Sequence, residues 1–134
     1  MSNPEHNIYD SSSVFFFSAI FDDAVMSAAE EIDYKKGTVL AFNATTGKYE
    51  QTKSGTAAVA NAKTILAQDV SFSAAGDKTV RILIGGQVDE DQLIWDGTDS
   101  PETIPAGAAD SFQLQLRAYG ILLRPLAQQS FEII

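Results

Sequence analysis

The sequence predicts a mainly β domain of the α+β class: a small, compact β body with one or two short helices and an extended N-terminal arm. Three observations lead to this prediction. Residues 80–84 alternate like a strand that is buried on one face and largely on the other, and a glycine pair follows. Short apolar runs separated by turn residues recur along the chain. The best helical pattern, with signals at both ends, lies at residues 110–120.

The length of the chain favours a single domain. Its 134 residues have a mass of 14.4 kDa, and a domain near this size buries roughly two thirds of the surface that its unfolded chain exposes. We expect residues 1–20 to form a partly apolar N-terminal arm and residues 21–134 to form one β-rich domain. The chain has no cysteine, which excludes disulfides and thiolate metal sites.

The charge balance argues against nucleic-acid binding. Nine Lys and Arg stand against 18 Asp and Glu, and the net charge of -9 would repel a phosphate backbone. The longest apolar run near the N-terminus covers residues 14–21 and includes a serine. A membrane span needs roughly 20 apolar residues, and no basic segment or cleavage site of a secretory signal is apparent. We therefore expect neither a nucleic-acid partner nor a membrane partner.

The first 21 residues combine a polar segment with an unusually apolar one. Ile8 and Tyr9 are the sizeable apolar residues of the segment 1–13. The segment 14–17 then places three phenylalanines in a row after a valine. Because such a run would promote aggregation if water reached it, something must cover it. It either folds back on the core of its own domain or packs in part against a partner, and both interpretations stay open.

The segment from Asp22 to Tyr34 has helical composition, with Asp22 as a possible N-cap. A helix would place Val25, Ala28 and Ile32 on one face. An extended segment that begins at Val25 is the alternative. We expect a helix here and keep the alternative open.

The central strand, residues 80–88, is interrupted by Gly85 and Gly86. Two glycines in a strand indicate a bulge, a sharp bend or the close approach of another backbone, so we predict a structural bend there. No Lys or Ser follows them as in a phosphate-binding loop. Trp95, the sole tryptophan, is predicted to anchor the core.

The helix predicted at residues 110–120 has clear end signals. Asp110 or Ser111 can cap its start, and Gly120 stands at the expected end. Phe112, Leu116 and Tyr119 are expected to share one face of this helix. A short strand is expected directly after it.

No constellation for catalysis is apparent, so we expect no enzyme activity, no catalytic or metal-binding residues and no cofactor. His6 is the one histidine, and it lies in the polar arm, which leaves no framework for a nucleophile and its base or for a histidine metal site. The acidic run 89–91 lacks the glycine and the final glutamate of an EF-hand loop. We interpret it as a solvated acidic rim.

The order of features over roughly residues 34–125 resembles the head decoration proteins of lambda-like tailed bacteriophages. The segments that carry the resemblance are Lys36-Gly37-Thr38-Val39-Leu40, Gly47-Lys48-Tyr49, Thr64-Ile65-Leu66-Ala67-Gln68-Asp69-Val70, the strand from Val80 to Val88 with Gly86 near its end, Leu93-Ile94-Trp95, and Leu116-Arg117-Ala118-Tyr119-Gly120-Ile121-Leu122-Leu123. These are structural residues, so the resemblance depends on their order and spacing.

The resemblance implies a structural cement protein of the virion, made in the host cytoplasm. Such proteins bind the major capsid protein on the outer surface of the mature head, as homotrimers at threefold and quasi-threefold sites, and stabilise the capsid against the pressure of packaged DNA. In that family the arm becomes ordered by adding to capsid strands. The capsid contacts expected here are Ile8, Tyr9, Val14, Phe15, Phe16 and Phe17.

A phage-associated binding module is the alternative function. A tail or receptor-binding domain that recognises a glycan or a host protein would need an exposed aromatic groove. Tyr49, Trp95 and Tyr119 are the candidates for such a groove.

Overall fold

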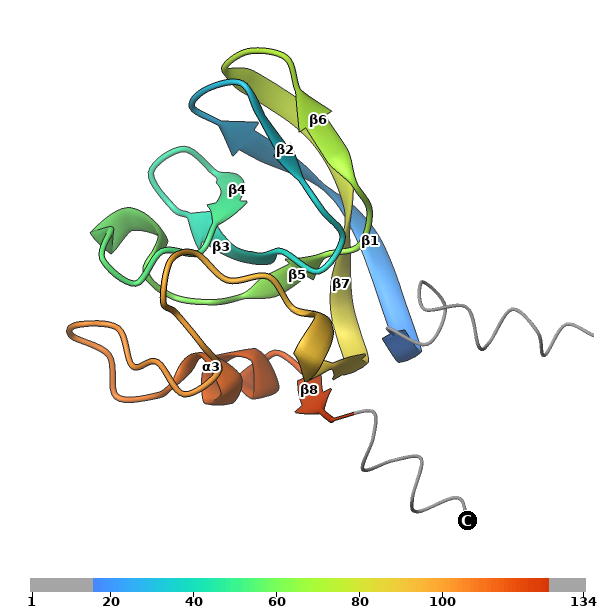
Figure 1. Ribbon diagram of the computed structural model, residues 1–134, viewed down its shortest axis with the longest axis vertical. Helices are drawn as coiled ribbons and strands as arrows, with labels where there is room; N and C mark the ends of the chain where they lie inside the picture. The colour runs from blue at the N-terminus through green and yellow to red at the C-terminus, as the bar shows by residue number, and fades with distance from the viewer. Residues whose placement is uncertain (1–15, 126–134) are drawn as a thin grey trace, which may run out of the picture.

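Strands make up most of the regular structure in the computed structural model, which describes residues 16–125 (Figure 1). The elements follow one another as β1 (Phe16–Ala28), β2 (Ile32–Tyr34), β3 (Val39–Asn43), β4 (Lys48–Gln51), the 3-10 turn η1 (Ala57–Val59), β5 (Thr64–Leu66), β6 (Val70–Phe72), β7 (Gly76–Asp89), the 3-10 turn η2 (Glu90–Gln92), α3 (Phe112–Ala118) and β8 (Ile121–Arg124). The prediction of a mainly β domain is confirmed for these residues. No helix among them has the length and apolar character that crossing a membrane requires.

Five of the strands pair in a ring. β1 pairs with β4, β4 with β3, β3 with β5, β5 with β7, and β7 pairs again with β1. The β1–β4 contact is a parallel bridge between Met26 and Tyr49, and the other four pairs are antiparallel. β8 lies parallel to β7 outside the ring, and β2 pairs with β6 in a separate two-stranded sheet. The sheet therefore closes into a small barrel that β8 extends on one side.

Two apolar clusters use opposite faces of the same strands. The first contains Leu40, Leu66 and Ile82, and the second contains their chain neighbours Val39, Ile65 and Leu83. Phe112 and Leu116 of α3 join the second cluster, so this cluster lies between the sheet and the helix. Because successive side chains of a strand point to opposite faces, burial on both faces explains the unbroken apolar runs in the sequence.

The predicted irregularity at the glycine pair is seen in how β7 pairs with β1. Ile20 lies opposite Gly85 and Phe21 lies opposite Leu83, so the register skips Ile84. Gly86 has a φ of +123°, a conformation that L side chains rarely adopt. Its N–H donates to the carbonyl of Gly120 over 3.0 Å, which ties β7 to the start of β8.

The helix predicted over residues 22–34 is wrong. These residues form the second half of β1, a bend and β2. Ala24, Met26 and Ala28 alternate toward the first apolar cluster with a period of two, while Val25 between them is 40% exposed. Long pairing with β7 outweighs the helical composition of this segment, because propensity is weak beside tertiary pairing.

The second predicted helix is confirmed as α3. The Ser111 side chain accepts a hydrogen bond from the Leu114 N–H, as an N-cap does. Gly120 takes a φ of +84° after the helix, and β8 begins at the next residue. This tight connection places α3 directly beside β8 (Figure 1).

Candidate functional site

The residues predicted to contact a capsid lie at the N-terminal end of the chain. Outside the described residues lie Ile8, Tyr9, Val14 and Phe15. The backbones of Phe16 and Phe17 begin β1 and pair with Val88 and Gln87 of β7. Residues 16–20, which the sequence assigns to the arm, therefore belong to the sheet.

Trp95 follows η2 and packs against the apolar cluster that contains α3. Its ring stacks on that of Phe112, with the centroids 5.4 Å apart and an interplanar angle of 15°. Trp95 is half-buried in this position, and one face of its ring packs against the core.

The acidic run 89–91 supports the local backbone. Asp89 is buried, and its carboxylate accepts a hydrogen bond from the Asp91 N–H over 3.1 Å, which caps η2. Burial, with Asp91 and Glu102 nearby, raises the pKa of Glu90. No group of three His, Cys, Asp or Glu side chains that could hold a metal ion occurs within residues 16–125.

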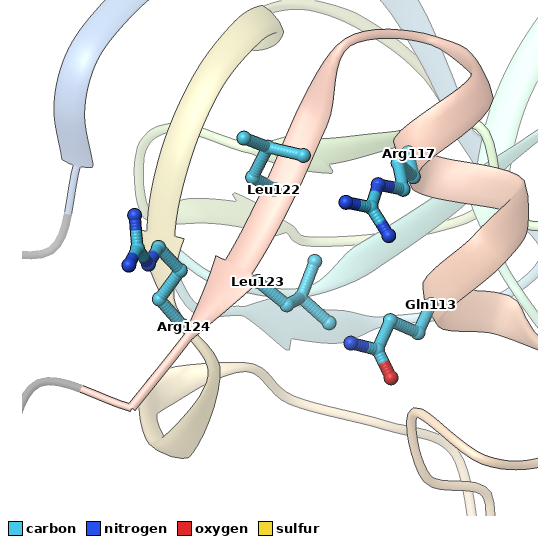
Figure 2. Close-up of a pocket in the computed structure, with 5 residues that line it drawn as sticks. All are labelled: Gln113, Arg117, Leu122, Leu123 and Arg124. Atoms are coloured by element: carbon cyan, nitrogen blue, oxygen red, sulfur yellow. The ribbon is translucent and has the colours of Figure 1, made fainter. Parts of the chain in front are cut away.

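A groove of about 370 Å³ lies between α3 and β8. The described residues that line it are Gln113, Arg117, Leu122, Leu123 and Arg124. Figure 2 shows that Arg117 and Gln113 project from α3 toward β8, whereas Arg124 leaves β8 on the side of β7. Two of the three arginines of the chain therefore line one groove.

Neither guanidinium group at this groove pairs with a carboxylate of residues 16–125. Arg124 donates from Nη1 to Oε1 of Gln87 over 3.4 Å, and Arg117 makes no side-chain hydrogen bond within the described part of the chain. The ion pair found in that part joins Lys48 to Asp77 elsewhere. Because guanidinium groups bind carboxylates in forked, charge-assisted pairs, the groove can bind a carboxylate-bearing segment.

An aromatic hollow of about 140 Å³ lies near the start of β8, beside β5 and β7. Its walls include Tyr49, Lys63, Ile84 and Tyr119. The Lys63 ammonium lies 5.4 Å from the ring centroid of Tyr119 and 4.8 Å from that of Phe42, within cation–π range. Two of the three aromatic residues that the sequence offers for a binding groove, Tyr49 and Tyr119, therefore line the same hollow.

The outer edge of β1 is a third exposed surface. β4 pairs with β1 at Met26, and no other strand of the described residues pairs along that edge. Ile20 is 61% exposed and Val25 is 40% exposed, while Asp22 and Asp23 between them are also exposed. An open sheet edge with apolar side chains is a surface that favours pairing with another chain.

The sequence reasoning missed the arginine groove. Arg117 is separated from Arg124 by only seven positions and by one glycine turn, and that spacing is the signal that could have found it. A helix followed at once by a strand brings its last turn beside that strand, so a cation on each element can line the groove between them.

No family model matches the sequence, and a search of curated proteins finds no match to it.

Proposed function

We propose that the protein is a structural decoration protein of a bacteriophage head. It binds the major capsid protein on the outer surface of the mature capsid as a homotrimer at threefold and quasi-threefold sites, with its N-terminal segment extended as an arm. Its role is mechanical, because a clamp that bridges neighbouring capsomers raises the cost of separating them under the pressure of packaged DNA.

The observation that carries the proposal is the apolar surface of β1. This strand follows the apolar segment of the arm directly in sequence, and its residues Ile20 and Val25 are exposed. Within residues 16–125, only the bridge from Met26 to Tyr49 pairs along the outer edge of the strand. A first strand with an exposed apolar surface can dock against a large partner surface, and the segment that precedes it can dock with it.

The physical setting supports the same function. Many weak contacts on one lattice act together, because each bound contact holds the next at a high effective concentration. The net charge of -9 suits a position on the outside of the head, away from DNA.

The arm provides the test. Deleting residues 2–15 leaves β1 whole, because the strand begins at Phe16. We expect this variant to fold with the melting temperature of the full chain and to lose binding to expanded, undecorated shells in a cosedimentation assay. The matched control is the full chain with Pro4→Ala, which keeps the length of the arm. A deletion variant that still saturates the shells would refute the role of the arm.

A phage-associated binding module is a second candidate, favoured by the aromatic hollow. Phe42 and Tyr119 flank the ammonium of Lys63, and Tyr49 lines the same mainly apolar depression. This chemistry takes an apolar group with a carboxylate nearby. Binding of the protein to host envelope but not to shells, lost in Tyr119→Ala and kept in Leu114→Ala, would support this function. Leu114 is a suitable control because it is exposed on the neighbouring α3.

A further inference from the structure

We propose that the groove between α3 and β8 binds the outer edge of β1 from a second copy of the chain. The contact is head-to-tail: β8 of one copy pairs with β1 of the next, and the arginines of the first meet the aspartates of the second. It is an interface of the protein with itself and does not require a shell.

β8 offers an open edge with a ready place for a strand. It pairs with β7 along Ile121–Arg124, and no other strand of the described residues pairs with its far edge. The groove of about 370 Å³ takes in Leu122 and Leu123 of β8 and the side chains that reach over from α3 (Figure 2). An extended backbone placed there can pair with β8 and cover Leu122, which is half-buried, whereas Leu123 already packs in the core.

The two arginines lie on opposite faces of β8. Ile121 and Leu123 pack in one cluster with Leu116 of α3, so α3 and its Arg117 cover that face. Arg124 has the opposite parity and bonds to Gln87 of β7. A strand added beside β8 would project consecutive side chains to the two faces in turn, so it needs two neighbouring carboxylates to meet both cations.

β1 supplies that pattern on an edge that is itself open. Asp22 and Asp23 are consecutive and exposed, so their carboxylates point to opposite faces of β1. Across the sheet Asp22 lies opposite Ile82, whereas Asp23 lies opposite Arg81 of its own chain. We therefore expect Asp22 to provide the larger share of the new electrostatic attraction.

A second copy fits this site better than a small anion does. A free anion would meet the guanidinium groups but would leave the edge of β8 and the half-buried Leu122 uncovered. The edge of β1 covers them and at the same time buries its own apolar residues Ile20 and Val25, which are otherwise exposed. Pairing would cover both open strand edges, which could otherwise pair with other chains and aggregate.

Joining two different surfaces of one chain gives a heterologous contact. Such a contact closes into a ring when the rotation between copies allows it, and otherwise grows as an open chain. That the ring has three members rests on the proposed function, whereas the pairing of the two edges does not.

Charge reversal with rescue tests the pairing in solution. Sedimentation equilibrium of the full chain up to about 1 mM is expected to show reversible self-association. Arg117→Glu with Arg124→Glu should weaken it by about tenfold or more, and so should Asp22→Lys with Asp23→Lys. Combining all four changes should restore association. The matched control for the arginine pair, Lys35→Glu with Lys53→Glu, alters net charge equally at exposed sites away from the groove and should have little effect.

Folding of each variant is checked by its melting temperature. Asp22→Lys alone replaces the aspartate pair if the double change fails to fold, because it leaves Asp23 opposite Arg81. A chain that remains monomeric at 1 mM, or a four-residue swap that fails to restore association in folded protein, overturns the proposal. A third result would also overturn it: the full chain does not self-associate, and the arginine variant loses binding to shells. The groove would then bind a segment of the shell and not a second copy of the chain.

The experiment separates the two proposals. Charge-dependent self-association without binding to shells would leave the paired edges standing and refute the decoration function. Saturation of shells by a chain that never self-associates would support the decoration function and refute the pairing of the two edges.

Discussion

Trp95 and Phe112 stack face to face, with ring centroids 5.4 Å apart, although they are 17 positions apart in the chain. Trp95 follows η2, and Phe112 is the first residue of α3. The pair therefore joins the end of the long β7 segment to the helix that carries Arg117. The position of the helix relative to the sheet depends on this contact.

Phe112→Ala should be strongly destabilising. The side chain is fully buried in the cluster between sheet and helix, and truncating a buried phenylalanine typically costs about 3–5 kcal/mol. Urea denaturation measures the change in the free energy of unfolding. Leu114→Ala on the same helix is the control, since Leu114 is 47% exposed and should change stability by no more than about 1 kcal/mol. Equal effects of the two changes would contradict the packing of α3.

Gly86→Ala should destabilise the protein more than Gly85→Ala. Gly86 has a φ of +123°, and a side chain in such a region costs about 1–3 kcal/mol. A Cβ on Gly85 would meet the Ile20 side chain at 3.9 Å and the Gly120 carbonyl at 4.0 Å, both ordinary contacts. Urea denaturation of the two variants compares the positions, and a larger cost at Gly85 would contradict the described backbone.

Asp77 should contribute to a loss of stability in acid. The hydrogen bond from the Lys48 ammonium, with a second from Ser27, holds the pKa of Asp77 below its usual range. A lowered pKa in the folded state gives stability that is present above the unfolded value, near 4, and is lost as pH falls through the folded value. Asp77→Asn should flatten the decline in unfolding free energy below pH 5.

Lys48→Gln provides the check on that interpretation. Because the larger of the two hydrogen bonds to Asp77 is then absent and the one from Ser27 remains, Asp77→Asn should have a smaller effect on the acid decline in the Lys48→Gln background than in the original chain. Additive effects of the two substitutions would show that Asp77 depends on another partner.

Glu90 should lower the stability of the folded state as pH rises, which is opposite to the effect of Asp77. Burial and then the charges of Asp91 and Glu102 raise its pKa, so the folded state prefers the protonated form. The resulting stability is present below the unfolded pKa and is lost as pH rises through the folded value. Glu90→Gln should therefore be more stable than the original chain at pH 7, with the difference disappearing near pH 4. A variant that is less stable at pH 7 would contradict this.

The sequence predicts the elements whose signals are local. Ser111 and Gly120 mark the two ends of α3 because capping and positive φ depend on neighbouring residues alone. The apolar run around Ile82 and Leu83 indicates a strand buried on both faces, and these two adjacent residues do belong to the two apolar clusters.

The elements that depend on distant partners could not be predicted in the same way. Residues 22–34 have helical composition, yet β7 pairs with Ala24 and its neighbours and draws them into the sheet. The bridge between Met26 and Tyr49 that closes the barrel joins residues 23 positions apart, and no local sequence pattern predicts it. The arginine groove arises from the same kind of tertiary placement, because Arg117 reaches β8 only when α3 packs beside it.

The melting temperature of expanded, undecorated shells tests the central claim most directly. The account predicts that the full chain binds them in stoichiometric amount and raises the temperature at which they come apart. Shells that melt at the same temperature with and without a saturating concentration of the protein would contradict it.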